Sequence, residues 1–178
     1  MIGALARAAG ALGLALAMAA CSGTGRQVAC PTVAIVPELH SVARFGPGPG
    51  RQDSDVIYGA VMQKAVVSCE IDKKRGGLVV ANKIGISALR GNTDVKKAQV
   101  TYFEAIINRN QQILTERDFV IDLEWPSTQA RLEDTEELET LLPLSANASG
   151  ADYAILFGFR LTPDELQYNR DHGPKPQG

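Results

Sequence analysis

An apolar side chain at every second position is the main pattern in the middle of the chain, and this spacing predicts β-strands. Residues 78–89 show it most clearly, because five apolar side chains share one parity: Leu78, Val80, Ile84, Ile86 and Ala88. Residues 113–125 alternate in the same way, and residues 32–36 and 100–107 are short runs rich in β-branched and aromatic side chains. These four segments predict strands with one buried face.

Two other segments are apolar on both parities. Residues 55–71 predict either one long strand or two strands that break near Gln63 and Lys64. Residues 151–161 combine aromatic side chains on odd positions with small and aliphatic side chains on even positions. Such a segment is typical of a central strand that is covered on both faces.

Short turns separate these segments. The runs KKRGG at 73–77 and NRNQ at 108–111 have the composition of hairpin turns. Residues 113–125 are followed by Pro126, which cannot continue a ladder. Because the strands follow one another without intervening helices, we predict an all-β fold, an immunoglobulin-like antiparallel β-sandwich of about seven strands.

Helical signals occur at two places. In residues 127–144 the leucines have helical spacing, but the acidic side chains favour a solvent-facing edge strand with an irregular return at 142–144; a short helix over 128–142 is the alternative. Thr162, Pro163 and Glu165 form the pattern of a capping box, which predicts one helical turn after the last strand.

The first twenty residues have the composition of an export signal. They contain one charge, Arg7, and an apolar run of about a dozen residues, which is too short to span a bilayer. The run ends in Met18-Ala19-Ala20-Cys21, a lipobox-like sequence that predicts cleavage before Cys21 and its modification by diacylglycerol and an N-acyl chain. The alternatives are an ordinary export signal and an apolar first helix.

This interpretation divides the chain into a signal peptide at 1–20, the acylated cysteine with a flexible tether at 21–30, a sandwich domain at 31–170 and a disordered tail at 171–178. Several acyl chains hold a protein stably on a bilayer. We therefore expect the protein to be lipid-anchored in the cell envelope and to face the periplasm. Ser22 favours the outer membrane over the inner membrane.

Charge and cysteine content add two expectations. Without Arg7 the mature chain has 17 basic and 20 acidic residues, a balance that gives no basis for nucleic-acid binding. In an exported protein, Cys30 and Cys69 form an even pair once Cys21 is acylated, so a disulfide is expected, with two unpaired thiols as the alternative. Closing a loop of about 40 residues stabilises by roughly 4 kcal/mol.

The sequence gives little support for catalysis or cofactors. His40 is the one histidine outside the predicted tail, and its neighbour Ser41 faces the opposite side of an extended chain, so no Ser-His pair is expected. Asp53 and Asp55 are weak candidates for a Ca²⁺ site, because they lack the spacing of a calcium loop. We therefore expect neither an enzyme nor a metal site, and no cofactor besides the lipid on Cys21.

Several features are spread over nearly the whole mature chain: Cys30-Pro31, the glycine-rich stretch 48–56, Cys69, Tyr102-Phe103 and the closing run GFRLTPDELQYNR at 158–170. With the lipobox, they resemble a family of alphaproteobacterial lipoproteins of unknown function. The resemblance implies location and architecture, and it implies no site residue.

The functional expectation is a non-catalytic, lipid-anchored accessory protein that binds another envelope protein. Tyr168, Asn169 and Arg170 follow the last strand without an evident structural duty, and tyrosine and arginine are enriched at binding hot spots, so they are the predicted contact surface. The alternatives are a sandwich that binds a small molecule or a glycan and, third, a hydrolase.

Overall fold

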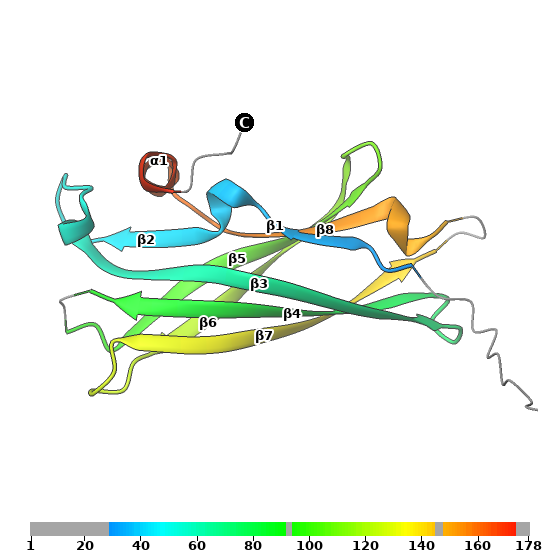
Figure 1. Ribbon diagram of the computed structural model, residues 1–178, viewed down its shortest axis with the longest axis horizontal. Coiled ribbons are helices and arrows are strands. Elements are labelled where there is room, and N and C mark those ends of the chain that lie inside the picture. The colour runs from blue at the N-terminus through cyan, green and yellow to red at the C-terminus, as the bar shows by residue number, and fades with distance from the viewer. Residues whose placement is uncertain (1–28, 92–93, 145–147, 174–178) are drawn as a thin grey trace, which may run out of the picture.

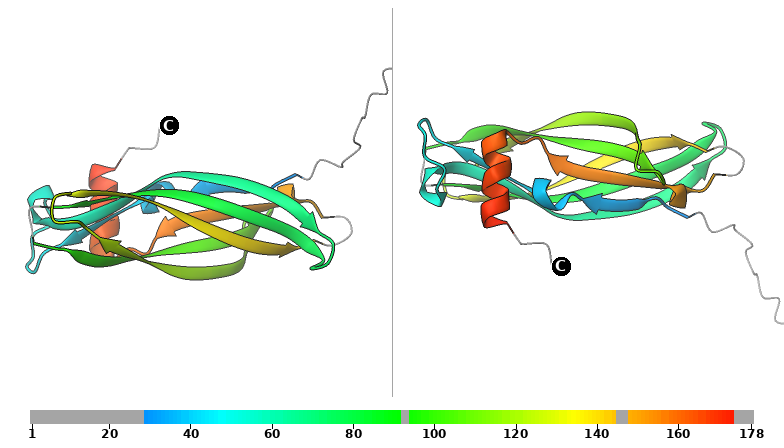
Figure 2. Two further views of the ribbon diagram at one scale, coloured as in Figure 1. Left: turned by 90° about the horizontal axis from the view of Figure 1, so that it is seen from below. Right: turned by 90° about the horizontal axis from the view of Figure 1, so that it is seen from above.

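The computed structural model describes residues 29–91, 94–144 and 148–173. The predicted signal peptide at 1–20, Cys21 and most of the predicted tether lie outside these residues. Within the described residues, eight strands form two four-stranded sheets that pack as an elongated sandwich (Figures 1 and 2). The strands are β1 (Thr32–Ile35), β2 (Ser41–Phe45), β3 (Val56–Asp72), β4 (Gly77–Arg90), β5 (Lys97–Asn108), β6 (Ile113–Glu124), β7 (Arg131–Pro143) and β8 (Tyr153–Phe159).

The order of strands is β1-β8-β5-β6 in one sheet and β2-β3-β4-β7 in the other. All neighbours are antiparallel except β1 and β8, which run parallel. The predicted all-β, immunoglobulin-like sandwich is therefore confirmed. Its strand order differs from that of the constant-type immunoglobulin domain, which places its first, second, fifth and fourth strands in one sheet.

The core lies between the two sheets. It consists of side chains on the alternate positions that the sequence pattern predicted to be buried. In the middle of β4, over residues 80–86, buried side chains alternate with exposed or half-buried ones, and both ends of the strand also have adjacent buried residues. In β6 the buried side chains Ile121 and Leu123 also alternate with exposed neighbours. The largest fully buried apolar side chains are Tyr102, Phe157, Phe159, Leu78, Ile84, Ile86, Leu123 and Ile155. The central position of β8 and the edge position of β7 are confirmed as well.

Strand β3 is a single strand with a β-bulge, and this explains its mixed pattern. The register with β4 shifts between Met62 and Lys64, so Gln63 is an extra residue. Before the bulge the even positions Ala60 and Met62 are buried, and after it the partly buried side chains fall on odd positions. The bulge therefore keeps one face of a long strand on the core while the parity changes.

The predicted disulfide between Cys30 and Cys69 is present, with a Cα–Cα distance of 5.7 Å. Cys30 precedes β1 in one sheet, and Cys69 lies on β3 in the other. The bond therefore ties the two sheets together at the end where the chain enters the sandwich. Cys30, which the sequence analysis placed at the end of the tether, is fixed to the domain.

Helix α1 (Pro163–His172) is longer than the single turn expected from the capping box, although the box itself is confirmed by the bonds between Thr162 and Glu165. Asp171 and His172 belong to this helix, so the predicted start of the tail at 171 is wrong. The rest of that tail, 174–178, lies outside the described residues. Figure 2 shows α1 lying across the strands beside β2.

Strand β2 was not expected from the sequence. It has five residues, and two adjacent ones, Val42 and Ala43, are both buried, so it shows no alternation. Its partner on one side is β3. The strand count is therefore eight instead of about seven.

Candidate functional site

The edges of the two sheets fall on two sides of the sandwich, with β1 and β2 on one side and β6 and β7 on the other. On the first side the edge strand β2 is covered by α1. The side-chain nitrogen of Asn169 donates to the backbone oxygens of Ser41 (2.8 Å) and Glu38 (2.9 Å), and Ser41 Oγ donates to Asn169 Oδ1 (3.2 Å). Asn169 thereby satisfies backbone groups at an edge, which is one way in which proteins block strand pairing.

The other side, formed by the edge strands β6 and β7, is open; we call it the β6–β7 side. Among the described strands, β6 pairs only with β5, and β7 pairs only with β4. On β6 three large apolar side chains are more than half exposed: Ile113 (61%), Leu114 (53%) and Val120 (58%). Unpaired strand edges and exposed apolar side chains are the features that other chains recognise.

A hollow of about 200 Å³ lies between the two strands. Four apolar side chains and four carboxylates line it: Ile86, Ala88, Leu123 and Leu132, together with Asp122, Glu124, Glu133 and Asp134. Glu124 pairs with Lys97, and Glu133 pairs with Arg131. Asp122 and Asp134 have no salt bridge to the described residues, although Lys97 is near enough to Asp122 for the two charges to interact. The hollow therefore combines apolar surface with an excess of negative charge.

A buried polar cluster links the sheets farther along the same side. The Glu104 side chain on β5 is fully buried, and it accepts hydrogen bonds from Thr140 Oγ1 (2.8 Å) and Arg117 Nε (3.1 Å). The hydroxyl of Tyr102 donates to Glu136 on β7 (3.2 Å). Burial is the main cause of a raised pKa at Tyr102, and the neighbouring Glu136 adds to it. The hydroxyl therefore stays protonated and bonded.

These interior polar groups were not among the residues predicted from the sequence. Asn82 lies on the buried parity of β4, is 1% exposed, and has no hydrogen-bond partner among the described residues at either side-chain atom. Glu104 has the inward parity of β5. A polar residue at an expected core position of an alternating strand is the signal that would have found both.

The predicted contact surface, Tyr168, Asn169 and Arg170, has intramolecular duties, so the premise of that prediction is wrong. Asn169 is 7% exposed and bonds to the β2 edge. Tyr168 Oη donates to Asp53 Oδ1 (2.6 Å), and burial followed by that bond raises the pKa of Tyr168 to about 12. Arg170 pairs with Glu38 at 3.0 Å. The three residues hold α1 in place.

Polar contacts dominate the docking of α1. Its two buried side chains are Glu165 and Asn169, and Glu165 pairs with Arg44 of β2. Arg51 pairs with Asp164 (2.8 Å) and lies 5.1 Å from the centre of the Phe45 ring. Leu166, which was expected to fold back onto the sandwich, is only half-buried.

The weak metal candidates Asp53 and Asp55 have separate partners. Asp53 accepts from Tyr168, and Asp55 accepts from the backbone nitrogen of Gln52 at 2.9 Å. In the part of the chain that the structure describes, no group of three or more His, Cys, Asp or Glu side chains is placed to hold a metal ion.

Neither histidine is placed to act as the base for the Ser41 hydroxyl. His40 Nδ1 lies 2.6 Å from the backbone oxygen of Pro37, and the hydroxyl of Ser41 is directed to Asn169. The His172 ring stacks on Tyr168 with a centroid distance of 4.2 Å. The structure therefore brings neither histidine together with Ser41 as a base.

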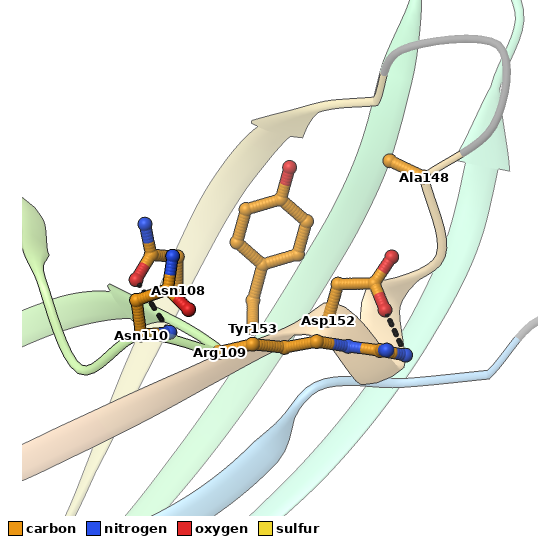
Figure 3. Close-up of a pocket in the computed structure, with 6 residues that line it drawn as sticks. All are labelled: Asn108, Arg109, Asn110, Ala148, Asp152 and Tyr153. Carbon is orange, nitrogen blue, oxygen red and sulfur yellow. Dashed lines mark hydrogen bonds and ion pairs between the residues drawn. The ribbon is translucent and has the colours of Figure 1, made fainter.

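A second hollow, of about 270 Å³, lies where the β5–β6 turn meets the 3₁₀ helix Gly150–Asp152. Figure 3 shows Arg109 and Asp152 paired beside the ring of Tyr153. Asn108 is bonded within the turn, where its Nδ2 donates to Gln112 at 2.9 Å. Two charged groups of this hollow are thus paired with each other, and Asn108 is bonded to its own turn.

No protein-family model, curated protein or solved structure matches this chain. Among the described residues, no helix is long and apolar enough to cross a membrane.

Proposed function

We propose that this chain is a non-catalytic, lipid-anchored protein of the bacterial cell envelope that binds another envelope protein. The observation that carries the binding role is the open β6–β7 side. A strand edge that is left unpaired offers backbone donors and acceptors to a second chain, which adds to it as a further strand. The contrast with β2, whose edge is occupied by Asn169, supports a specific use of the open side.

The anchoring role rests on the lipobox-like sequence before Cys21 and on the resemblance to the lipoprotein family. The described chain begins at Ala29 and enters β1 at one end of the sandwich (Figure 1), beside Gly150. Helix α1 and the 46–55 loop lie toward the other end. An anchor on Cys21 would therefore hold the sandwich by the end that carries the disulfide. Ser22 favours the outer membrane as the place of attachment.

The anchor is tested by Cys21→Ser. The wild-type protein should partition into the detergent phase and incorporate labelled palmitate, because several acyl chains give stable attachment. The variant should do neither. A variant that still partitions with membranes would contradict the lipid anchor.

The binding role is tested by crosslinking in the native envelope, followed by purification of the full-length protein. Leu114→Lys with Val120→Lys places charges on β6, and Val61→Lys with Val66→Lys is the matched control on the outer face of the other sheet; all four side chains are exposed. The wild type and the control should recover the same partner, and the β6 variant should lose it. Equal recovery with the β6 variant would contradict the role of this side.

A further inference from the structure

We propose that the β6–β7 side binds an extended, positively charged segment of the partner, which pairs with the free edge of β6 and directs Lys or Arg side chains to the carboxylates of β6 and β7. This inference rests on the proposed binding of a protein and adds the chemistry of the bound segment. Three features carry it: the backbone of β6, the charge of both edges and the shape of the hollow between them.

The ladder between β5 and β6 shows which backbone groups of β6 are free. The backbone nitrogen of Trp125 donates to the oxygen of Lys96 (2.9 Å), and the register continues with Lys97 opposite Glu124. In an antiparallel pair, the residues whose N–H and C=O groups point to the partner alternate along the strand. The backbone groups of Asp118, Val120 and Asp122 therefore point away from β5, toward the open edge.

The charges at this edge fit a cation. Asp122, Asp134 and Glu136 have no salt bridge among the residues that the structure describes. Asp122 accepts from Gln99 Nε2 (2.7 Å), Asp134 from the backbone nitrogen of Thr135 (2.7 Å), and Glu136 from the Tyr102 hydroxyl (3.2 Å). These bonds orient the carboxylates, and Lys97, which pairs with Glu124, also interacts with the charge of Asp122. A basic segment would compensate the remaining negative charge, whereas an acidic one would be repelled.

The hollow fits the shape of a long basic side chain. Lys and Arg bury their methylene stems on apolar surface while the charged group stays at a polar rim. The buried side chains of Ile86, Ala88 and Leu123 form the floor of the hollow of about 200 Å³, and the partly exposed Leu132 adds apolar surface. Asp122 and Asp134 supply carboxylates that have no salt bridge among the described residues. One side chain of the added strand would therefore enter the hollow while its neighbours point to solvent.

A second copy of this chain fits the edge less well. Antiparallel pairing of β6 with itself would bring Glu116, Asp118, Asp122 and Glu124 of two copies onto one shared face. Arg160 pairs with Glu116 and Asp118, and Lys97 pairs with Glu124, so the carboxylate without a salt bridge that this pairing would double is Asp122. Like charges that face each other across a strand pair are destabilising. The occupant argued for here is therefore a basic segment of a different protein.

The test uses the full-length protein and synthetic peptides of about eight residues in which Lys or Glu alternates with Val. Fluorescence anisotropy of the labelled Lys-Val peptide should show saturable binding that weakens with salt, and the Glu-Val peptide should not bind. A Lys-Val peptide with N-methyl groups on alternate backbone nitrogens keeps its charge and loses one row of donors. It should bind at least about tenfold more weakly. Equal binding of the methylated peptide would overturn strand addition.

Two variants of the protein test the same site, with the Lys-Val peptide unchanged. Val120→Pro removes a backbone donor that faces the open edge, at a position where proline is tolerated. Asp122→Asn with Asp134→Asn removes the two carboxylates of the hollow that have no salt bridge among the described residues. Each should weaken Lys-Val binding about tenfold, while thermal unfolding reports whether the fold is kept. Glu70→Gln with Asp171→Asn, two exposed carboxylates elsewhere, is the control and should bind as the wild type does.

Three outcomes separate this inference from the proposed function. Loss of binding in both variants and retention in the control would support the basic segment. Equal binding in all proteins, or dimerisation of the protein without peptide, would overturn it. If the peptides fail while crosslinking in the envelope still captures a partner through β6, the chemistry of the segment is wrong and the binding role stands.

Discussion

At the scale of residues, the core differs from a purely apolar core because it contains buried polar side chains. Asn82 is enclosed between the sheets, and neither its amide nitrogen nor its oxygen has a partner among the described residues. An unpaired buried amide loses its hydration without gaining a hydrogen bond, which costs about 1–3 kcal/mol.

Asn82→Val should therefore raise the free energy of unfolding by about 1–2 kcal/mol, because it removes the desolvated amide and suits a strand. Urea denaturation of both proteins measures the difference. Unchanged or lower stability of the variant would mean that the amide is satisfied in solution.

Glu104 is the opposite case, a buried carboxylate whose partners are all present. Arg117→Met leaves it without its cation and should lower the free energy of unfolding by about 3 kcal/mol. Arg131→Met is the matched control, because Arg131 and Glu133 are both more than half exposed and such pairs contribute about 0–1 kcal/mol. Equal losses in the two variants, measured by chemical denaturation, would contradict this role of Glu104.

At the scale of elements, the alternation of apolar positions predicted the strands that have one face in the core and one in solvent. It therefore located β4 and β6 and both hairpins, including the first turn, where Gly76 has a φ of 70°. Strand β2 was missed because Val42 and Ala43 are buried on both parities. The bulge at Gln63 was missed because it depends on the register of the neighbouring strand.

The role of α1 could not be predicted from its own sequence, because its partners are far away along the chain. Asn169 bonds to residues more than 120 positions earlier, and Tyr168 bonds to Asp53. The candidate site could not be predicted from the sequence for the same reason. The acidic edge strand β7 was predicted, but its position on the same side as β6 follows from the strand order, which alternation does not determine.

Alkaline pH should weaken the docking of α1. The pKa of Tyr168 is raised from 10.0 to about 12, because burial and the bond to Asp53 favour the protonated phenol. The folded state thus keeps a proton that the unfolded state loses above pH 10. The stabilisation is complete below the unfolded pKa and is lost as the pH rises through the folded one.

The free energy of unfolding of the wild type should therefore fall more steeply between about pH 10 and pH 12 than that of Tyr168→Phe. The comparison isolates this residue, because the other tyrosines are the same in both proteins. Parallel pH profiles from urea denaturation would show that Tyr168 does not titrate as proposed.

At the scale of the whole molecule, the two sides of the sandwich differ in how their strand edges are covered. On one side Cys30–Cys69 joins the two sheets and α1 covers β2, and on the other side neither edge strand has a second strand partner within the described part of the chain. The pairing of the two cysteines could be predicted from their even number, whereas the link between the two sheets follows only from the fold.

Cys30→Ser with Cys69→Ser should lower the free energy of unfolding by about 4 kcal/mol, because the bond closes a loop with a sequence separation of 39 residues. Reduction of the wild type should give a similar loss in denaturant titrations. A double variant as stable as the oxidised protein would show that packing alone joins the sheets.

In the proposed function, the β6–β7 side holds a segment of another envelope protein. The most direct measurement places a photo-reactive amino acid at Leu114 on β6 or, as the control, at Val66 on β3, and sequences by mass spectrometry the peptide that becomes attached in the native envelope. We expect one adduct from position 114 and none from 66, with Lys or Arg at alternate positions of the attached peptide. No adduct at 114, or the same adducts at both positions, would contradict the claim.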